Sequence, residues 1–194
     1  KLIDDGYENI TILNFLSSIG TSINLTKFKN IEELLSNFDL SKISNSSPKF
    51  SLNILTNLNK EILQISDFNY VKEKIDNLKY LNFDEKFWIF IRNNITFFSE
   101  SLEWYELIFN NKQYIDNPDS FFTISAELLP KEPYDISSWE KWTNSIKEKT
   151  QKNGKDLYMP LRIALTSKSK GPELKYLMPL LTKKHIQKKL GYIQ

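Results

Sequence analysis

The residues best suited to chemistry lie in one short stretch near the C terminus. Arg162 stands in the apolar run LYMPLRIALT, and Lys168 and Lys170 alternate with serines directly after it. Lysines neutralise phosphates, and the planar guanidinium of arginine can hydrogen-bond the edge of a nucleobase or stack on its face. Small serines let a nucleic-acid backbone come close. The types and spacing of these residues therefore indicate a site for nucleic acid.

Residues that follow the lysines could complete such a site. Pro172 and Leu174 could offer apolar surface to an unstacked base, and Pro172 predicts the start of a helix. The free N–H groups at that helix end would point into the loop, where they favour an anion. In the alternative interpretation, Arg162 reaches from the core to a carboxylate and the loop is a plain connector. The residues alone leave both interpretations open.

Residues for catalysis are scarce. His185 is the one histidine, and its place in a lysine-rich terminal segment predicts a surface residue. The chain has no cysteine, which excludes disulfides, thiolate zinc sites and cysteine nucleophiles. It also has no glycine-rich nucleotide-binding motif. The residues predict a binding protein with no catalytic, cofactor or metal site of its own.

The elements that must position these residues are helical. Apolar residues recur at helical spacing and no convincing alternating pattern appears, so we predict an all-α protein of two helical subdomains. Ile12, Leu13 and Leu16 predict the buried face of a first helix. A serine-to-glutamate capping box at 137–140 predicts another helix start. Further helices or aromatic-rich helical segments are expected at 51–65, 68–80, 84–97, 99–111, 156–166, 172–180 and 183–190.

Charge is unevenly distributed along the chain. Residues 141–194 carry 13 Lys or Arg against 3 Asp or Glu, whereas residues 1–140 carry 13 against 21. A basic segment on an acidic body favours a polyanion as partner, although a solvated lysine-rich surface gives the same count. No apolar run approaches the roughly 18 residues that a membrane-spanning helix needs.

The segment LYMPLRIALTSKSKGPELKYLMPLL resembles the C-terminal signature of bacterial glutamyl-tRNA synthetases. That signature reads Leu-Phe-Met-Pro-Leu-Arg-x-Ala-Leu-Thr-Gly, then a short basic stretch, then Gly-Pro-Glu-Leu. Upstream, SSWEKWTNSIKEKTQKNGKDLY and ISAELLPKEPYD are similar to the Trp-bearing helix of the family and to its leucine–proline linker. The resemblance covers nearly the whole chain and is closest to the alphaproteobacterial members.

The resemblance implies an all-α helical cage of two subdomains, of the class I glutamyl-tRNA synthetase anticodon-binding type. Residues 1–35 would end the stem-contact region, 36–115 would form the first anticodon-binding subdomain and 116–194 the second. The His-Ile-Gly-His and Lys-Met-Ser-Lys motifs of the family are absent, and the chain begins at Lys1. We therefore expect an inactive fragment of a cytoplasmic, monomeric ligase that uses ATP and Mg²⁺ to attach glutamate to tRNA.

The resemblance also implies which residues lie at the anticodon. They are Arg162, Lys168, Lys170, Gly171, Pro172, Leu174 and Arg92. Arg162 would contact the anticodon loop, and the glycine–proline turn would frame the third anticodon base. Ser167 stands where the family has glycine, and Lys170 where a histidine is frequent, so the sequence leaves open whether tRNA(Gln) is bound besides tRNA(Glu).

A hypothesis of another class is a helical protein-interaction module. The aromatic segments from Phe87 to Phe109 would then form an exposed groove, and the lysines would only keep the protein soluble. A self-standing enzyme is disfavoured, because the sequence offers no general base, nucleophile or metal cluster.

Overall fold

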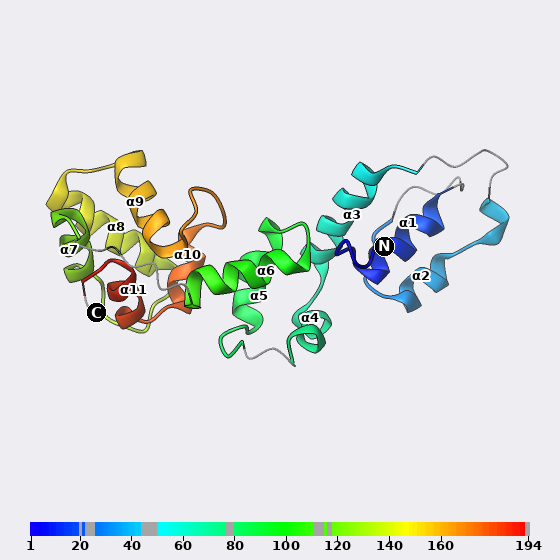
Figure 1. Cartoon of the computed structure of the whole chain (residues 1–194), viewed down its shortest axis with the longest axis horizontal. Helices are drawn as coiled ribbons and strands as arrows, with labels where there is room; N and C mark the ends of the chain where they lie inside the picture. Colours follow the sequence, from blue (N-terminus) through cyan, green and yellow to red (C-terminus); the bar gives the residue numbers. More distant parts are fainter. Residues whose placement is uncertain are drawn as a thin grey trace. The chain divides into compact units, whose positions relative to one another are not determined.

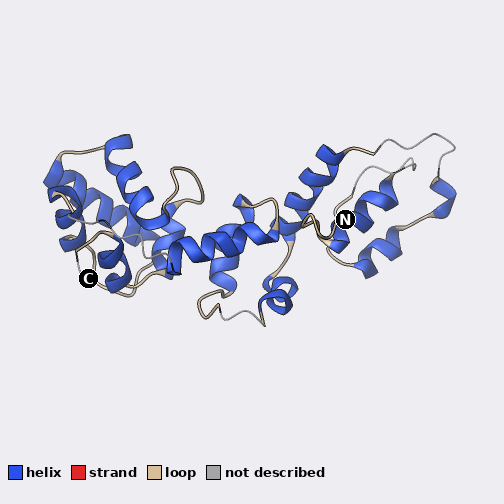
Figure 2. Ribbon diagram, in the orientation of Figure 1, coloured by secondary structure: helices blue, strands red, loops and turns tan. Residues whose placement is uncertain are grey.

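The described part of the chain consists of helices and loops. The computed structural model describes residues 1–19, 21, 26–43, 50–76, 80–110, 115 and 118–192. Within these ranges no strand occurs, and Thr21 and Ile43 form one isolated antiparallel bridge (Figure 2). The prediction of an all-α fold is confirmed.

The helices form two compact units (Figure 1). Unit 1 comprises Lys1–Tyr80 and Arg92–Leu102, and unit 2 comprises Leu81–Ile91 and Glu103–Gln194. The chain therefore leaves unit 1, returns to it and leaves it again. The division into 1–35, 36–115 and 116–194 implied by the family resemblance stays a prediction.

Unit 1 is built around one long amphipathic helix. Its helices are α1 (Asn9–Ser18), α2 (Ile31–Asn37), α3 (Leu52–Ile65), α4 (Phe68–Ile75) and the first part of α6 (Phe98–Tyr105), with short 3₁₀ turns at Leu40–Lys42 and Arg92–Asn94. Leu55, Leu58 and Ile62 place the apolar stripe of α3 in the core. The predicted helix over 51–65 is confirmed, with Ser51 as its N-cap.

Helix α1 buries a different face from the predicted one. Ile10 and Phe15 lie in the core, whereas Leu16 is 57% exposed and Leu13 also faces solvent. Asn14 fixes this orientation, because its buried amide group donates to the Phe28 carbonyl and accepts the Phe28 N–H. A polar side chain with two hydrogen bonds to a neighbouring segment thus outweighs the apolar pattern. Gly20, a residue type that often follows the end of a helix, lies outside the described residues.

Unit 2 has an aromatic core. Its helices are α5 (Glu85–Ile91), the end of α6, α7 (Ser120–Glu127), α8 (Ile136–Thr150), α9 (Gly154–Thr166), α10 (Leu174–Leu177) and α11 (Lys183–Lys189), with a π-helical turn at Glu106–Asn110 and a 3₁₀ turn at Met178–Leu180. The rings of Phe87, Tyr105 and Phe109 meet at centroid distances of 4.9 to 5.7 Å. Trp142 of α8 is also buried, and its indole N–H donates to the Ser125 carbonyl at 2.7 Å.

Helix α8 begins at Ile136, two residues before the predicted start. Asp135 is its N-cap, since its carboxylate accepts the Ser138 N–H while the Ser138 hydroxyl accepts the Asp135 N–H. The predicted serine-to-glutamate box at 137–140 is therefore wrong. Hydroxyl groups of Ser137 and Ser138 that donate to the carboxylate lower the pKa of Asp135, which keeps the cap ionised.

Candidate nucleic-acid interface

Arg162 lies on the flank of α9. Leu157, Leu161 and Leu165 bury one face of this helix, and Arg162 stands beside them, half-buried. Its guanidinium donates from Nη1 to the Pro172 carbonyl at 3.0 Å. Burial lowers the pKa of Arg162, although arginine stays charged. Arg162 has no ion pair with a carboxylate among the described residues, so the alternative of a salt-bridged arginine is not supported.

The loop over residues 167–173 is held at its start by α9. Ser167 adopts the left-handed conformation with φ 56°, and its N–H donates to the Ile163 carbonyl at 2.7 Å. The Thr166 hydroxyl lies within hydrogen-bonding distance of the Lys168 N–H and carbonyl. With the bond from Arg162 to Pro172, both ends of the 167–173 loop are attached to α9.

Two expectations about the far end of the loop are wrong. Pro172 and Leu174 are buried, so neither is the exposed apolar surface that was expected, and Leu174 contributes only to the lining of a hollow beside Arg162. Helix α10 begins at Leu174 and has 4 residues, with Glu173 as N-cap. The helix thus starts two residues after Pro172, and the Glu173 side chain makes no cap hydrogen bond to it and pairs instead with Lys175 at 2.7 Å.

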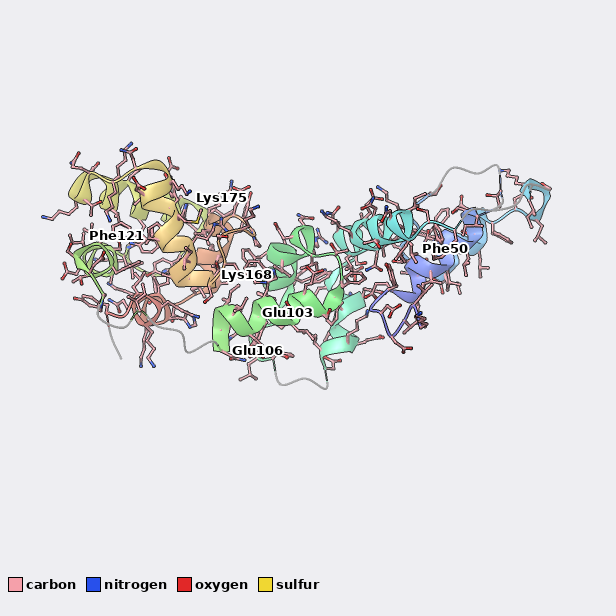
Figure 3. The ribbon with its side chains drawn as sticks, turned by 45° about the horizontal axis from the view of Figure 1, so that its top comes forward. Phe50, Glu103, Glu106, Phe121, Lys168 and Lys175 are labelled. Carbon is pink, nitrogen blue, oxygen red and sulfur yellow. The ribbon has the colours of Figure 1, made fainter. Side chains whose placement is uncertain are left out.

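The cations of the loop differ in their surroundings. Lys168 places its ammonium 4.7 Å from the centre of the Trp104 ring. Lys170 is exposed, and among the described residues it has no ion pair or ring contact. Figure 3 shows Lys168 in the loop after α9 and Lys175 in α10. Lys170 is therefore the cation of this loop that is best placed to meet a phosphate.

A small hollow lies beside Arg162. It has a volume of about 210 Å³ and is lined by Trp139, Tyr158, Arg162, Glu173, Leu174 and Lys175. Trp139 and Tyr158 have ring centroids 6.4 Å apart. Aromatic faces and a guanidinium are the groups on which unpaired RNA bases stack. Neither Trp139 nor Tyr158 is among the residues that the sequence predicted for the site.

Six of the seven predicted site residues lie in unit 2, around the 167–173 loop. Arg92 belongs to unit 1, where its Nη1 donates to the Ser66 carbonyl at 2.9 Å. Ser66 is the C-cap of α3, so Arg92 satisfies a carbonyl at the end of that helix. The structure thus gives Arg92 a structural contact, and its place at the anticodon stays a prediction.

His185 and Lys189 form a cap on the π-helical turn. The Nε2 of His185 lies 2.8 Å from the Ile108 carbonyl, and the Lys189 ammonium donates to the Leu107 carbonyl at 2.8 Å. Burial lowers the pKa of both residues, to about 8 for Lys189, which is 1% exposed. His185 is therefore half-buried and structural, and the prediction of a plain surface residue is wrong.

The aromatic segments do not form an exposed groove. Phe87, Trp88, Trp104 and Tyr105 are all buried. Their rings fill the core of unit 2, as expected for large apolar side chains. The protein-interaction hypothesis therefore lacks the surface on which it depended.

Two features of the described residues bear on other classes of function. In the ranges that the structure describes, no three His, Asp or Glu side chains gather where they could hold a metal ion. None of the helices there combines the length and the apolar character that crossing a membrane requires.

Comparison with known proteins gives matches over most of the chain. A family model described as an anticodon binding domain matches residues 89–193. Glutamate–tRNA ligase 2 of Rickettsia canadensis is 34% identical over 188 residues, which are 95% of this chain and 42% of that protein. Glutamate–tRNA ligase 2 of Beijerinckia indica is 31% identical over 182 residues, 93% of this chain and 40% of that protein. The chain spans about two fifths of the length of the curated relatives it matches.

Solved structures share the fold. A glutamate–tRNA ligase from Elizabethkingia meningosepticum, in complex with its amino acid, superimposes with a TM-score of 0.76 at 16% identity. The match covers 97% of this chain and 41% of that one. A glutamate–tRNA synthetase from Elizabethkingia anophelis gives a TM-score of 0.74 at 17% identity. At such identities the likeness concerns the fold alone.

Proposed function

Because this chain belongs to the family of anticodon-binding domains, as its resemblance predicted, we propose that it reads the anticodon for a glutamate–tRNA ligase. The complete ligase would join glutamate to tRNA(Glu) with ATP and Mg²⁺, in the cytoplasm and as a monomer. The chain would contribute binding and orientation of the tRNA, and the chemistry of the amino acid would take place in the rest of the protein.

One observation carries the proposal. The family match over residues 89–193 includes α9 and the 167–173 loop, where Arg162, Lys170 and the hollow beside Arg162 occur together. Lys170 would neutralise a backbone phosphate, and Arg162 with the rings of Trp139 and Tyr158 would hold an unpaired base. Phosphate contacts fix the register of the RNA, and base contacts supply the selectivity.

The choice between tRNA species is part of the same proposal. We take tRNA(Glu) as the cognate partner, since the matching ligases are named for glutamate. Ser167 and Lys170, the two departures from the family pattern, lie in the 167–173 loop near the base positions. Binding of tRNA(Gln) would be decided there, at the third anticodon base.

A titration of the whole 194-residue chain tests the proposal. The ligands are an anticodon stem-loop of tRNA(Glu) and the same stem-loop with its third anticodon base changed, each at two salt concentrations. We expect tighter binding of the Glu loop and a loss of affinity for both at higher salt, because the lysines release counterions from the RNA.

The outcomes separate the hypotheses. Equal, salt-sensitive binding of the two loops would leave a basic surface but remove the anticodon-reading role. An affinity that does not change with salt concentration would indicate an apolar interaction surface instead. Absence of binding at either salt would contradict the proposal for this chain alone, and the same titration with the complete ligase would then show whether the catalytic part is required.

A further inference from the structure

The 167–173 loop touches a residue that no sequence motif connects to it. Trp104 belongs to α6, far upstream in the chain and outside the C-terminal signature, and it lies in the same unit as the loop. Its side chain is only 5% exposed. The residue is therefore fixed in the core of unit 2 and presents one edge and one face of its ring to the loop.

The edge of the ring contacts Gly171. A Cβ atom added at Gly171 would lie 2.2 Å from Cη2 of Trp104 and 2.7 Å from Cζ2, far inside any normal contact. The φ angle of Gly171 is also +147°, a conformation that side chains rarely adopt. Only glycine allows the loop backbone to lie this close to the indole.

The face of the ring contacts Lys168. The ammonium group lies 4.7 Å from the ring centroid, within the range of a cation–π interaction. Lys168 and Gly171 stand three residues apart, so one rigid ring meets the loop at two points. With Arg162 on the Pro172 carbonyl, the middle and the end of the loop are both held from outside its own sequence.

We propose that Trp104 is a positioning residue that sets the 167–173 loop in the geometry for reading RNA bases, and that Lys168 fastens the loop to this ring and is not a phosphate ligand. The inference rests on the proposed function and adds a residue to it. A loop that already has its bound geometry loses less conformational freedom on binding, so its selectivity depends on what holds it.

A double-mutant cycle on Trp104 and Gly171 tests the contact. Gly171→Ala in the native background places a methyl group against Cη2 and Cζ2 and should displace the loop, which lowers the preference for the Glu stem-loop. Trp104→Leu removes both atoms, so in that background Gly171→Ala should lower the preference for the Glu stem-loop by a smaller factor. If Gly171→Ala lowers this preference by the same factor in both backgrounds, the Trp104 ring does not position the loop, and the inference is overturned.

Trp104→Leu alone should lower the ratio of affinities for the Glu loop and the changed loop by roughly tenfold, within the range for loss of one base contact. The slope of affinity against salt should stay the same, because no phosphate contact is lost. Trp104→Phe, which keeps a ring face, should recover part of the ratio. Phe87→Leu is the matched control, since this buried ring packs on the rings of Phe83, Tyr105 and Phe109.

An equal fall of the ratio in Phe87→Leu would mean that Trp104 acts only through general stability, and the inference would be lost. If native protein shows no preference for the Glu loop, the proposed function fails and this inference falls with it. If native protein shows the preference and Trp104→Leu keeps it, the inference alone fails.

The two lysines give an independent test. Lys170→Met should reduce the salt slope by about 0.7, the change for one lost contact to single-stranded RNA. Lys168→Met should leave the slope unchanged and lower the ratio of affinities. A reduced slope of affinity against salt in Lys168→Met would show that the Lys168 ammonium leaves the Trp104 ring for a phosphate. That result would contradict the proposed role of Lys168 in holding the loop.

Discussion

At the scale of single residues, Arg162 both holds the 167–173 loop and lines the hollow beside it. Its Nη1 is engaged by the Pro172 carbonyl, while the planar group has further N–H donors and lines the hollow beside Trp139 and Tyr158. A lysine could supply the charge but not this fork. The position therefore demands arginine for geometry as well as for charge.

Arg162→Ala should weaken binding of the Glu stem-loop by about 1–3 kcal/mol and reduce its advantage over the changed loop. The reason is the loss of both the loop bond and the base contact. Arg162→Lys should recover much of the salt-dependent affinity but little of the selectivity. Unchanged affinities in Arg162→Ala, measured by anisotropy with both stem-loops, would remove Arg162 from the site.

Lys189 predicts an unusual dependence of stability on pH. Burial lowers its pKa to about 8, below the value of roughly 10.4 for an unfolded chain. Between these values the unfolded state binds more protons than the folded state, so stability rises with pH. Relative to Lys189→Met, the native protein should gain about 2–3 kcal/mol from pH 7 to pH 10, as measured by urea unfolding.

Lys184 is exposed on the same helix, so Lys184→Met controls for the loss of one positive charge. A constant difference between native protein and Lys189→Met across this pH range would show that Lys189 keeps its proton in the folded state.

Part of the site was readable from sequence at this scale. A charged residue in an apolar run and two lysines among serines identified Arg162 and the 167–173 loop. Trp104 was not identifiable, since an aromatic residue in an aromatic segment carries no mark of which loop it touches. Pro172 and Leu174 were read as surface, because burial of a loop depends on partners that α8 and α9 bring from elsewhere in the chain.

At the scale of elements, Asn59 connects three segments of unit 1. Its Oδ1 accepts the Glu8 N–H before α1 at 2.8 Å, and its Nδ2 donates to the Thr96 carbonyl before α6 at 2.6 Å. It stands on α3 among apolar residues and is fully buried. A buried amide with both ends bonded orients the entries of two helices.

Asn59→Ala should destabilise unit 1 by about 1–3 kcal/mol, because the Glu8 N–H and the Thr96 carbonyl lose their partner in a buried place. Thermal unfolding followed by circular dichroism measures the effect. Asn57→Ala, on the exposed side of the same helix, should change stability little. Similar effects of the two substitutions would contradict the connecting role of Asn59.

Helix prediction succeeded where an apolar stripe is long and failed where polar groups decide. The stripe of α3 gave its bounds to within one residue. The buried face of α1 depends on hydrogen bonds of Asn14, and the start of α8 depends on the Asp135 carboxylate. The pattern of apolar residues in the sequence predicts neither effect. Helix α10 ends after 4 residues, and a pattern of apolar residues over 172–180 does not distinguish this from one longer helix.

At the scale of the whole molecule, charge and site fall in the same unit. Unit 2 contains residues 141–194, with 13 Lys or Arg against 3 Asp or Glu, and six of the seven predicted site residues. A basic segment of this kind draws RNA by long-range attraction before any specific contact forms. The acidic residues of 1–140 would discourage binding away from this segment.

Amide hydrogen exchange should show this division. Addition of the Glu stem-loop is expected to slow exchange in α9, α10 and the loop between them, while the core amides of α3 in unit 1 keep their rates. The stem-loop with the changed base, at a concentration giving equal occupancy, serves as control. Protection centred on α3 would contradict an interface in unit 2.

The order of segments in the two units has a consequence for synthesis on the ribosome. Residues Leu81–Ile91 leave the exit tunnel before Arg92–Leu102, yet their partners in unit 2 come only after Glu103. Phe87 and Trp88 are fully buried in the finished protein, and the Phe87 ring packs on Tyr105 and Phe109. These partners follow Arg92–Leu102 in the chain, so the two side chains stay exposed at least until that segment has been translated. A nascent chain with two such side chains uncovered is a natural client for chaperones, and slowed translation after this point would lengthen the period of risk.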